Sequence, residues 1–169
     1  MLKTKTNIEL IVEQTGLIAS DQISIHIEEA QKQHLPIPAY LAKQFEIQEN
    51  DLLMKIADVM QLPYERLNDK DIDSGILDQI PTKAIFQFNV IPIYQKQDKL
   101  IVSTADPFTS GLIDVLQLAT NQCVRLLLSP IDDITEAVRK FYGVGAETLD
   151  EMIESNTIDF DEDDDLTKQ

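Results

Sequence analysis

Apolar residues recur at helical spacing through the first sixty residues and repeat there with an offset of 29 positions. A fixed period of this kind indicates one supersecondary unit used twice. The matched pairs are Ile8 with Ile37, Val12 with Leu41, Ile18 with Ile47, Ile23 with Leu52, Ile27 with Ile56 and Ala30 with Val59. Each copy predicts a short helix, a turn and a second helix, so residues 1–61 are expected to form a helical subdomain of four helices.

The clearest helix of this region is predicted from Asn50 to Met60. Its apolar residues share one face, because they stand at i, i+1, i+4 and i+7: Leu52, Leu53, Ile56 and Val59. Asn50 is a suitable N-cap, since its side-chain oxygen accepts hydrogen bonds from free helix amides.

After Val90 the apolar period changes from helical spacing to two. Residues 90–94 and 100–103 alternate in the manner of strands, and the polar stretch 95–98 between them predicts the turn of a β-hairpin. A helix is then predicted from Leu112, Val115, Leu116 and Ala119, and a third strand over 123–128. Strand, helix and strand in this order predict a crossover onto the same sheet.

The helix over residues 130–142 has signals at both ends. Ser129 is expected to cap it, Pro130 suits its first turn, and Gly143 is placed to terminate it. The fold class is therefore α+β: a four-helix repeat unit followed by a small mixed sheet, made of a hairpin and a crossover strand, packed with helices.

Three regions follow from these elements. Residues 1–61 form the helical subdomain, residues 62–145 an α/β subdomain, and residues 146–169 a short helix and an acidic linker. The run 159–165 carries too many carboxylates to be buried, so we expect it to be solvated. Such a tract suggests a chain that was cut within an interdomain linker.

Charge and cysteine content exclude several classes of protein. The formal net charge is −16, which argues against nucleic-acid binding, because phosphate backbones are bound by clustered Lys and Arg. The single cysteine allows no intrachain disulfide and suits a reduced cytoplasmic setting. Apolar stretches are too short to cross a bilayer, so direct membrane insertion is not expected.

Machinery for a reaction is not visible in the sequence. None of the five glycines belongs to a GxxxxGK[ST] phosphate loop. His26 and His34 lack further ligands at metal spacing, so packing or surface roles are favoured over zinc. Cys123 is interpreted as a small buried hydrophobe, with a reactive thiol beside Arg125 as the alternative. We therefore expect no catalytic residue, cofactor or metal, and we disfavour a hydrolase that uses scattered acidic pairs.

The order of several short motifs resembles one known family. They are Leu62-Pro63-Tyr64, Ile80-Pro81, Val90-Ile91-Pro92-Ile93, the run from Leu100 to Pro107, Leu118-Ala119-Thr120, and the ending from Phe141 through Gly145 to Thr148. Together with the helical repeat they span about nine tenths of the chain. They are similar to the N-terminal domain of type II secretion system protein E and the type IV pilus assembly ATPases.

This resemblance implies a non-catalytic docking and regulatory domain. In the family, the ATP-hydrolysing domains follow this region after a flexible linker, so the parent protein is implied to be an ATPase. The implied partners are the cytoplasmic domain of an inner-membrane assembly protein and the chain's own ATPase domains. The implied location is cytoplasmic and peripheral at the inner membrane, through that partner.

Some relatives bind cyclic-di-GMP through two motifs that begin Arg-Leu-Gly and end in Gln, which supports a cyclic-dinucleotide sensor as the alternative function. The corresponding positions in this chain are degenerate: Asn7, Glu9, Gly16 and Ala30 in the first copy, and Pro36, Pro38, Phe45 and Val59 in the second. Only Gly16 is retained, and Glu9 would repel a phosphate. We therefore expect no cyclic-di-GMP binding.

The surface that contacts the protein partner is proposed by analogy alone. It comprises the sheet edge near residues 90–94 and the helix over 110–120, with five candidate residues: Val90, Pro92, Tyr94, Asp114 and Gln117.

Overall fold

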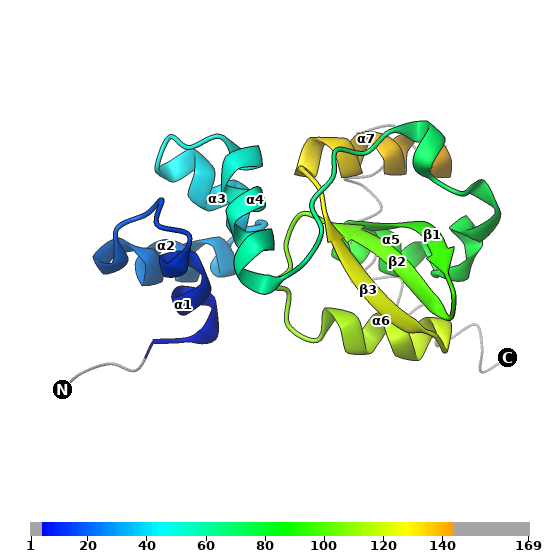
Figure 1. Cartoon of the computed structure of the whole chain (residues 1–169), viewed down its shortest axis with the longest axis horizontal. Helices are drawn as coiled ribbons and strands as arrows, with labels where there is room; N and C mark the ends of the chain where they lie inside the picture. Colours follow the sequence, from blue (N-terminus) through cyan, green and yellow to red (C-terminus); the bar gives the residue numbers. More distant parts are fainter. Residues whose placement is uncertain (1–4, 144–169) are drawn as a thin grey trace, which may run out of the picture.

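The computed structural model describes residues 5–143, which form two groups of elements (Figure 1). The helical lobe contains α1 (Asn7–Gln14), α2 (Ser20–Lys32), α3 (Ile37–Gln44) and α4 (Glu49–Met60). The sheet lobe contains the 3₁₀ helices η1 (Asp69–Asp71) and η2 (Ser74–Gln79), then α5 (Thr82–Phe88), β1 (Val90–Lys96), β2 (Lys99–Thr104), α6 (Leu112–Thr120), β3 (Cys123–Leu128) and α7 (Ile131–Tyr142).

The helical lobe has its own apolar core, built from the repeated positions. Val12 and its counterpart Leu41 are both fully buried, and Ile27 and Ile56 are buried as well. The two copies of the repeat are the pairs α1–α2 and α3–α4. The expected helical repeat therefore reflects one packing pattern used twice.

The sheet has three strands in the order β1-β2-β3 within the described residues. β1 and β2 are antiparallel and turn at Gln97 and Asp98, whereas β2 and β3 are parallel and are connected through α6. The pairing of β1 shifts by one residue between Pro92 and Tyr94, a β-bulge. The expected hairpin and crossover strand are both present.

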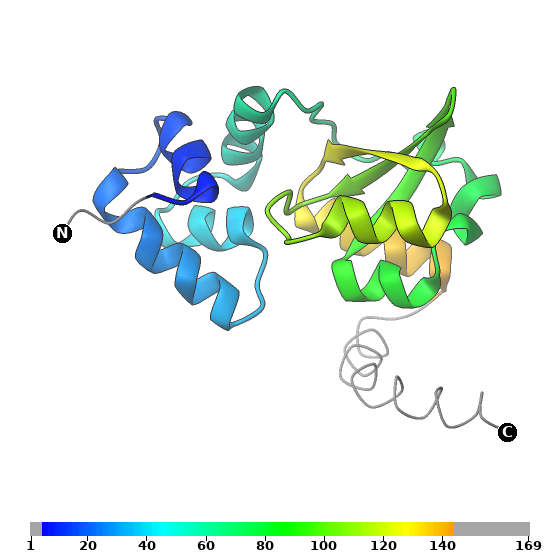
Figure 2. The same cartoon turned by 90° about the horizontal axis from the view of Figure 1, so that it is seen from below.

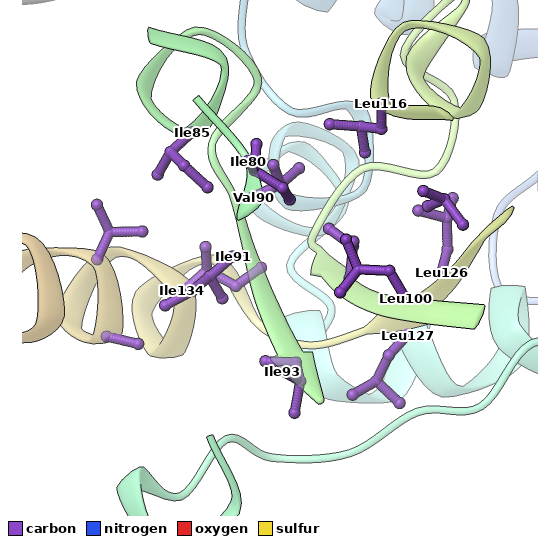
Figure 3. Close-up of a cluster of buried hydrophobic side chains, with 14 of the residues drawn as sticks. Ile80, Ile85, Val90, Ile91, Ile93, Leu100, Leu116, Leu126, Leu127 and Ile134 are labelled. Atoms are coloured by element: carbon purple, nitrogen blue, oxygen red, sulfur yellow. The ribbon is translucent and has the colours of Figure 1, made fainter. Parts of the chain in front are cut away.

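Helices cover both sides of this sheet. Figure 3 shows Leu116 of α6 above Leu100 and Leu126 on one side, and Ile134 of α7 beside Ile91 on the other. Viewed from below, α6 lies along the outside of the sheet lobe (Figure 2). The mixed sheet packed with helices confirms the α+β fold class.

Both N-caps expected from sequence are wrong. α4 begins one residue earlier, after Gln48, and Asn50 instead accepts a hydrogen bond from the Tyr64 hydroxyl at 2.8 Å. α7 follows Pro130 at its N-cap, and the Ser129 hydroxyl pairs with that of Ser103 at 2.6 Å. In each case the polar side chain forms a hydrogen bond with a residue distant in sequence and does not cap its own helix.

The sheet lobe contributes a residue to the core of the helical lobe. Leu128, the last residue of β3, is fully buried among the side chains of the helical lobe. The division at residues 61 and 62 stays a prediction, and residues 146–169 lie outside the described part of the chain. No helix between residues 5 and 143 is long and apolar enough to cross a membrane.

Candidate functional site

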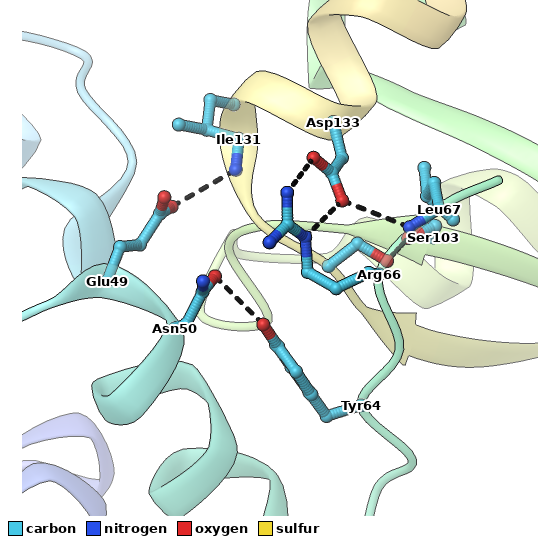
Figure 4. Close-up of polar contacts among 9 residues, drawn as sticks. Glu49, Asn50, Tyr64, Arg66, Leu67, Ser103, Ile131 and Asp133 are labelled. Carbon is cyan, nitrogen blue, oxygen red and sulfur yellow. Dashed lines mark hydrogen bonds and ion pairs between the residues drawn. The ribbon is translucent and has the colours of Figure 1, made fainter.

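The junction between the lobes is fastened by a carboxylate that caps a helix of the opposite lobe. The Oε2 atom of Glu49, in α4, accepts a hydrogen bond from the backbone amide of Ile131 at 3.1 Å (Figure 4). Ile131 is the first residue of α7, where helix amides have no partner within the helix. Burial raises the pKa of Glu49, and the nearby charges of Asp132 and Asp133 raise it further. The hydrogen bond from Ile131 acts in the opposite direction and lowers this pKa.

A second carboxylate makes the reciprocal contact. Asp106, in the loop after β2, accepts a hydrogen bond at 3.1 Å from the amide of Ile37, the first residue of α3. Its other oxygen accepts from the Phe108 amide at 3.0 Å. Burial raises the pKa of Asp106, while these two hydrogen bonds lower it. Each lobe thus supplies the N-terminal cap of one helix in the other.

The connecting segment after α4 binds to the end of β3. Pro63 accepts a hydrogen bond from the Leu128 amide at 2.9 Å, and the Glu65 amide donates to the Leu128 carbonyl at 3.0 Å. Tyr64 therefore forms an isolated parallel bridge with Leu128. This segment holds the last turn of α4 against the sheet.

Beside it lies an ion pair between Arg66 and Asp133. Two guanidinium nitrogens of Arg66 donate to the two carboxylate oxygens at 2.7 and 2.9 Å, and the Leu67 amide adds a bond at 3.0 Å (Figure 4). The hydrogen bond from Arg66 lowers the pKa of Asp133. Arg66 is exposed, so this pair contributes little free energy, and the backbone bond fixes the start of α7 more firmly.

A cavity of about 860 Å³ lies between the lobes. It is lined by the end of α2 and the start of α3, the end of α5, the loop after β2, and Thr135 and Arg139 of α7. Three phenylalanines make its wall largely apolar: Phe86, Phe88 and Phe108. Among the described residues, no group of three or more His, Cys, Asp or Glu could hold a metal ion.

The degenerate cyclic-di-GMP positions carry little polar chemistry in the structure. Asn7 and Glu9 lie in the first turn of α1, and Gly16 has a φ of 73°, which suits glycine. Ala30 and Pro38 are buried, and the remaining positions are half-buried: Pro36, Phe45 and Val59. The absence of cyclic-di-GMP binding at these positions stays a prediction.

The residues proposed for partner binding lie in different environments. Val90 and Pro92 are buried, and Tyr94 is 38% exposed. The outer edge of β1 is also partly covered, because the Asp73 amide donates to the Ile93 carbonyl at 2.7 Å. The buried side chains of Val90 and Pro92 therefore offer no surface to a partner.

α6 presents the other two candidates. Asp114 is exposed, whereas Gln117 accepts a hydrogen bond from the Val124 amide at 3.0 Å and so attaches α6 to β3. Sequence reasoning missed Leu118, which is 87% exposed. The sequence did hold a sign of this exposure, because Leu118 lies outside the apolar stripe that was predicted for the helix. Cys123 is also exposed, so its interpretation as a buried hydrophobe is wrong.

The family model of the MshEN domain matches residues 60–148, slightly more than half of the chain. The chain belongs to the MshEN domain family. This confirms the resemblance to N-terminal domains of the type II secretion and type IV pilus ATPases. No curated protein matches the sequence of this MshEN domain.

Two solved structures share the fold of this MshEN protein. The structure of MshE with cdg has a TM-score of 0.63 at 13% identity, covering 82% of this chain and 100% of that one. The N-terminal domain of XpsE has a TM-score of 0.61 at 18% identity, covering 82% and 98%. At such identities the likeness concerns the fold.

Proposed function

We propose that this MshEN domain is a docking and regulatory module that attaches a secretion or pilus assembly ATPase to an inner-membrane assembly protein. The observation that carries the proposal is the exposure of three apolar side chains on α6, with Leu118 on its outward side and Ile113 and Val115 on its two flanks. Leu118 is 87% exposed there, and Ile113 and Val115 are each 41% exposed. Exposed apolar residues gathered on one element are typical of protein interaction sites.

α6 is held firmly enough to present these exposed side chains to a partner. Its inner residues Leu112 and Leu116 are buried in the core of the sheet lobe. Gln117 binds the Val124 amide, and the Thr120 hydroxyl donates to the Leu116 carbonyl at 2.7 Å. A partner that covers Leu118 would therefore bind a surface that is already ordered, which lowers the entropic cost of association.

Asp114 places a charge beside Leu118 on the outward side of α6, because residues four apart in a helix are neighbours. It is exposed on α6 between Ile113 and Val115, where a carboxylate can pair with a cation of the partner. Interfaces commonly combine an apolar centre with a polar rim. The partner surface is thus expected to provide an apolar contact for Leu118 and a cation for Asp114.

The direct test is binding to the cytoplasmic domain of the inner-membrane assembly protein. Calorimetry should detect binding by the folded chain, and Leu118→Glu should weaken it by at least about tenfold, as expected for an interface hot spot. Ile25→Glu is the matched control, because Ile25 of α2 is 65% exposed in the other lobe. Equal affinities of both variants, or no binding by folded protein, would contradict the proposal.

The second candidate is a cyclic-dinucleotide sensor, which the shared fold with the structure of MshE with cdg favours. Against it, the position of the final Gln in the first motif is Ala30, which is fully buried. Pro38, at a glycine position of the second motif, is buried as well. We expect calorimetry with cyclic-di-GMP to show no heat of binding, and micromolar affinity would support the sensor.

A further inference from the structure

Among residues 5–143, no helix covers one half of a sheet face. Strand register places Tyr94, Ile101 and Arg125 in one row across the three strands. The adjacent row consists of Lys96, Lys99 and Cys123. Residues two apart on a strand point to the same side, so both rows lie on one face.

The exposure of these side chains agrees with that placement. Lys96, Cys123 and Arg125 are exposed, Tyr94 is 38% exposed, and Lys99 and Ile101 are half-buried. Further along the same face, Ile91 and Leu127 are buried with α7. α7 thus covers one end of the face and leaves the end near the hairpin turn open. We call these two rows the basic half-face.

The charge of the basic half-face is opposite to that of the protein. Its three cationic side chains are Lys96, Lys99 and Arg125, and neither row contains an acidic residue, whereas the chain as a whole has a formal net charge of −16. Asp98, in the hairpin turn, is the adjacent carboxylate on these strands. A site that combines cations with Tyr94 and Ile101 fits an acidic segment that also carries an aromatic ring.

The same chain contains such a segment. Six of the seven residues from 159 to 165 are acidic, and the remaining one is Phe160. Residues 144–158 connect it to the end of α7 and can span at most about 54 Å, at 3.3 to 3.6 Å per residue. A tethered segment also acts at a high effective concentration.

We propose that residues 159–165 bind the basic half-face of their own chain. The carboxylates pair with Lys96, Lys99 and Arg125, and Phe160 packs against Ile101 and Tyr94. Three strands are about 10 Å across and seven extended residues reach about 23 Å, so the segment is long enough to cross both rows. This contact is independent of the docking function, which uses α6.

Cys123 provides a native probe, since it is the only cysteine and lies within the basic half-face. A nitroxide attached to its sulfur in the 169-residue chain should broaden the amide NMR signals of residues 159–165 at low salt. These signals should recover in 1 M NaCl, where the Debye length falls to about 3 Å. Full signal intensity at low salt would overturn the proposal.

Two variants separate this contact from chance proximity. Lys96→Glu with Arg125→Glu should restore the signals, whereas Lys43→Glu with Lys55→Glu, which reverses two exposed charges of the helical lobe, should leave them broadened. Changing the six acidic residues of 159–165 to their amides should restore the signals without altering the sheet face. Broadening that survives either change at the contact overturns the proposal.

A mixed sample identifies which chain supplies the segment. Isotope-labelled protein with a blocked thiol is combined with unlabelled protein carrying the nitroxide. Unaffected signals support binding within one chain. Broadened signals would show that a second copy supplies the segment, and would overturn the proposal in its intramolecular form.

Discussion

The carboxylate of Glu49 caps the amide of Ile131, 3.1 Å away, although 82 positions separate them in the chain. The Asp106 carboxylate caps Ile37 at the same distance in the opposite direction across the junction. Because each contact joins a side chain of one lobe to a helix start of the other, the two together restrict rotation between the lobes. The stability of the junction can therefore be tested one carboxylate at a time.

Replacing Glu49 by Ala should lower the free energy of unfolding by about 1 kcal/mol, because α7 loses its N-terminal cap. Glu49→Gln keeps an oxygen acceptor and should stay within about 0.5 kcal/mol of the original protein. Urea unfolding followed by circular dichroism measures both. Asp58→Ala, at an exposed position of α4, is the control, and a loss as large as that of Glu49→Ala would argue against the cap.

Asp106 should give the protein a pH dependence of defined sign. Its pKa in the folded state is raised above the ordinary 3.8, so the unfolded chain releases the proton first as pH rises. The free energy of unfolding therefore falls as pH increases from the ordinary pKa through the raised one, and is level above it. Asp106→Asn should remove this contribution to the pH dependence of the free energy of unfolding.

The test measures urea midpoints of the original protein and of Asp106→Asn across pH 3 to 8. The contributions of the other titrating groups cancel in the difference between the two proteins. Glu49, whose pKa is also raised, keeps a slope of the same sign in the variant. Parallel curves for the two proteins would mean that Asp106 titrates alike in the folded and unfolded states.

Leu128→Ala should destabilise both lobes together. Leu128 is fully buried in the core of the helical lobe although it ends a strand of the sheet lobe. Its truncation should cost about 2 to 5 kcal/mol, whereas Leu35→Ala, at a residue 42% exposed, should cost less than about 0.5 kcal/mol. Hydrogen exchange should show protection lost in helices of both lobes. Loss confined to β3 would contradict the packing of Leu128 in the helical core.

Gln61→Gly should stabilise the protein by about 0.5 kcal/mol. Gln61 follows α4 with φ 57° and ψ 43°, a left-handed conformation that costs residues with a Cβ about 1 to 2 kcal/mol. Glycine removes that cost and loses part of the gain through the entropy of its unfolded state. Gln61→Ala, which keeps the Cβ, is the control, and thermal unfolding of the two should rank glycine higher.

The elements of this fold are predictable because each is written in local apolar spacing. The period of two at residues 90–103 specified the hairpin, and the repeated pairs such as Val12 and Leu41 specified the helical lobe. N-terminal helix caps were not predictable in the same way, whereas Gly143 ends α7 as expected. Asn50 and Ser129 are good local caps, but Tyr64 and Ser103 bind them instead, and the cap of α7 comes from Glu49.

The surface was predicted less well than the core for a related reason. The edge of β1 at Val90 and Pro92 was expected by analogy to be available, yet both side chains are buried because helices cover both sides of the sheet there. Leu118 lies outside the predicted apolar stripe of α6, but its spacing alone does not show whether another element covers it. These features depend on which elements pack together.

The mixed sheet also implies an order of folding. β1 and β2 meet across the two residues Gln97 and Asp98, whereas β3 reaches β2 only after residues 105–122 have formed the crossover. Loop closure is costlier for the longer connection, so the hairpin should form first and β3 should add later. Since Leu128 and the two capping contacts follow the placement of β3, the lobes should join in the last step. Mutations at the junction are then expected to accelerate unfolding and to leave the rate of folding nearly unchanged.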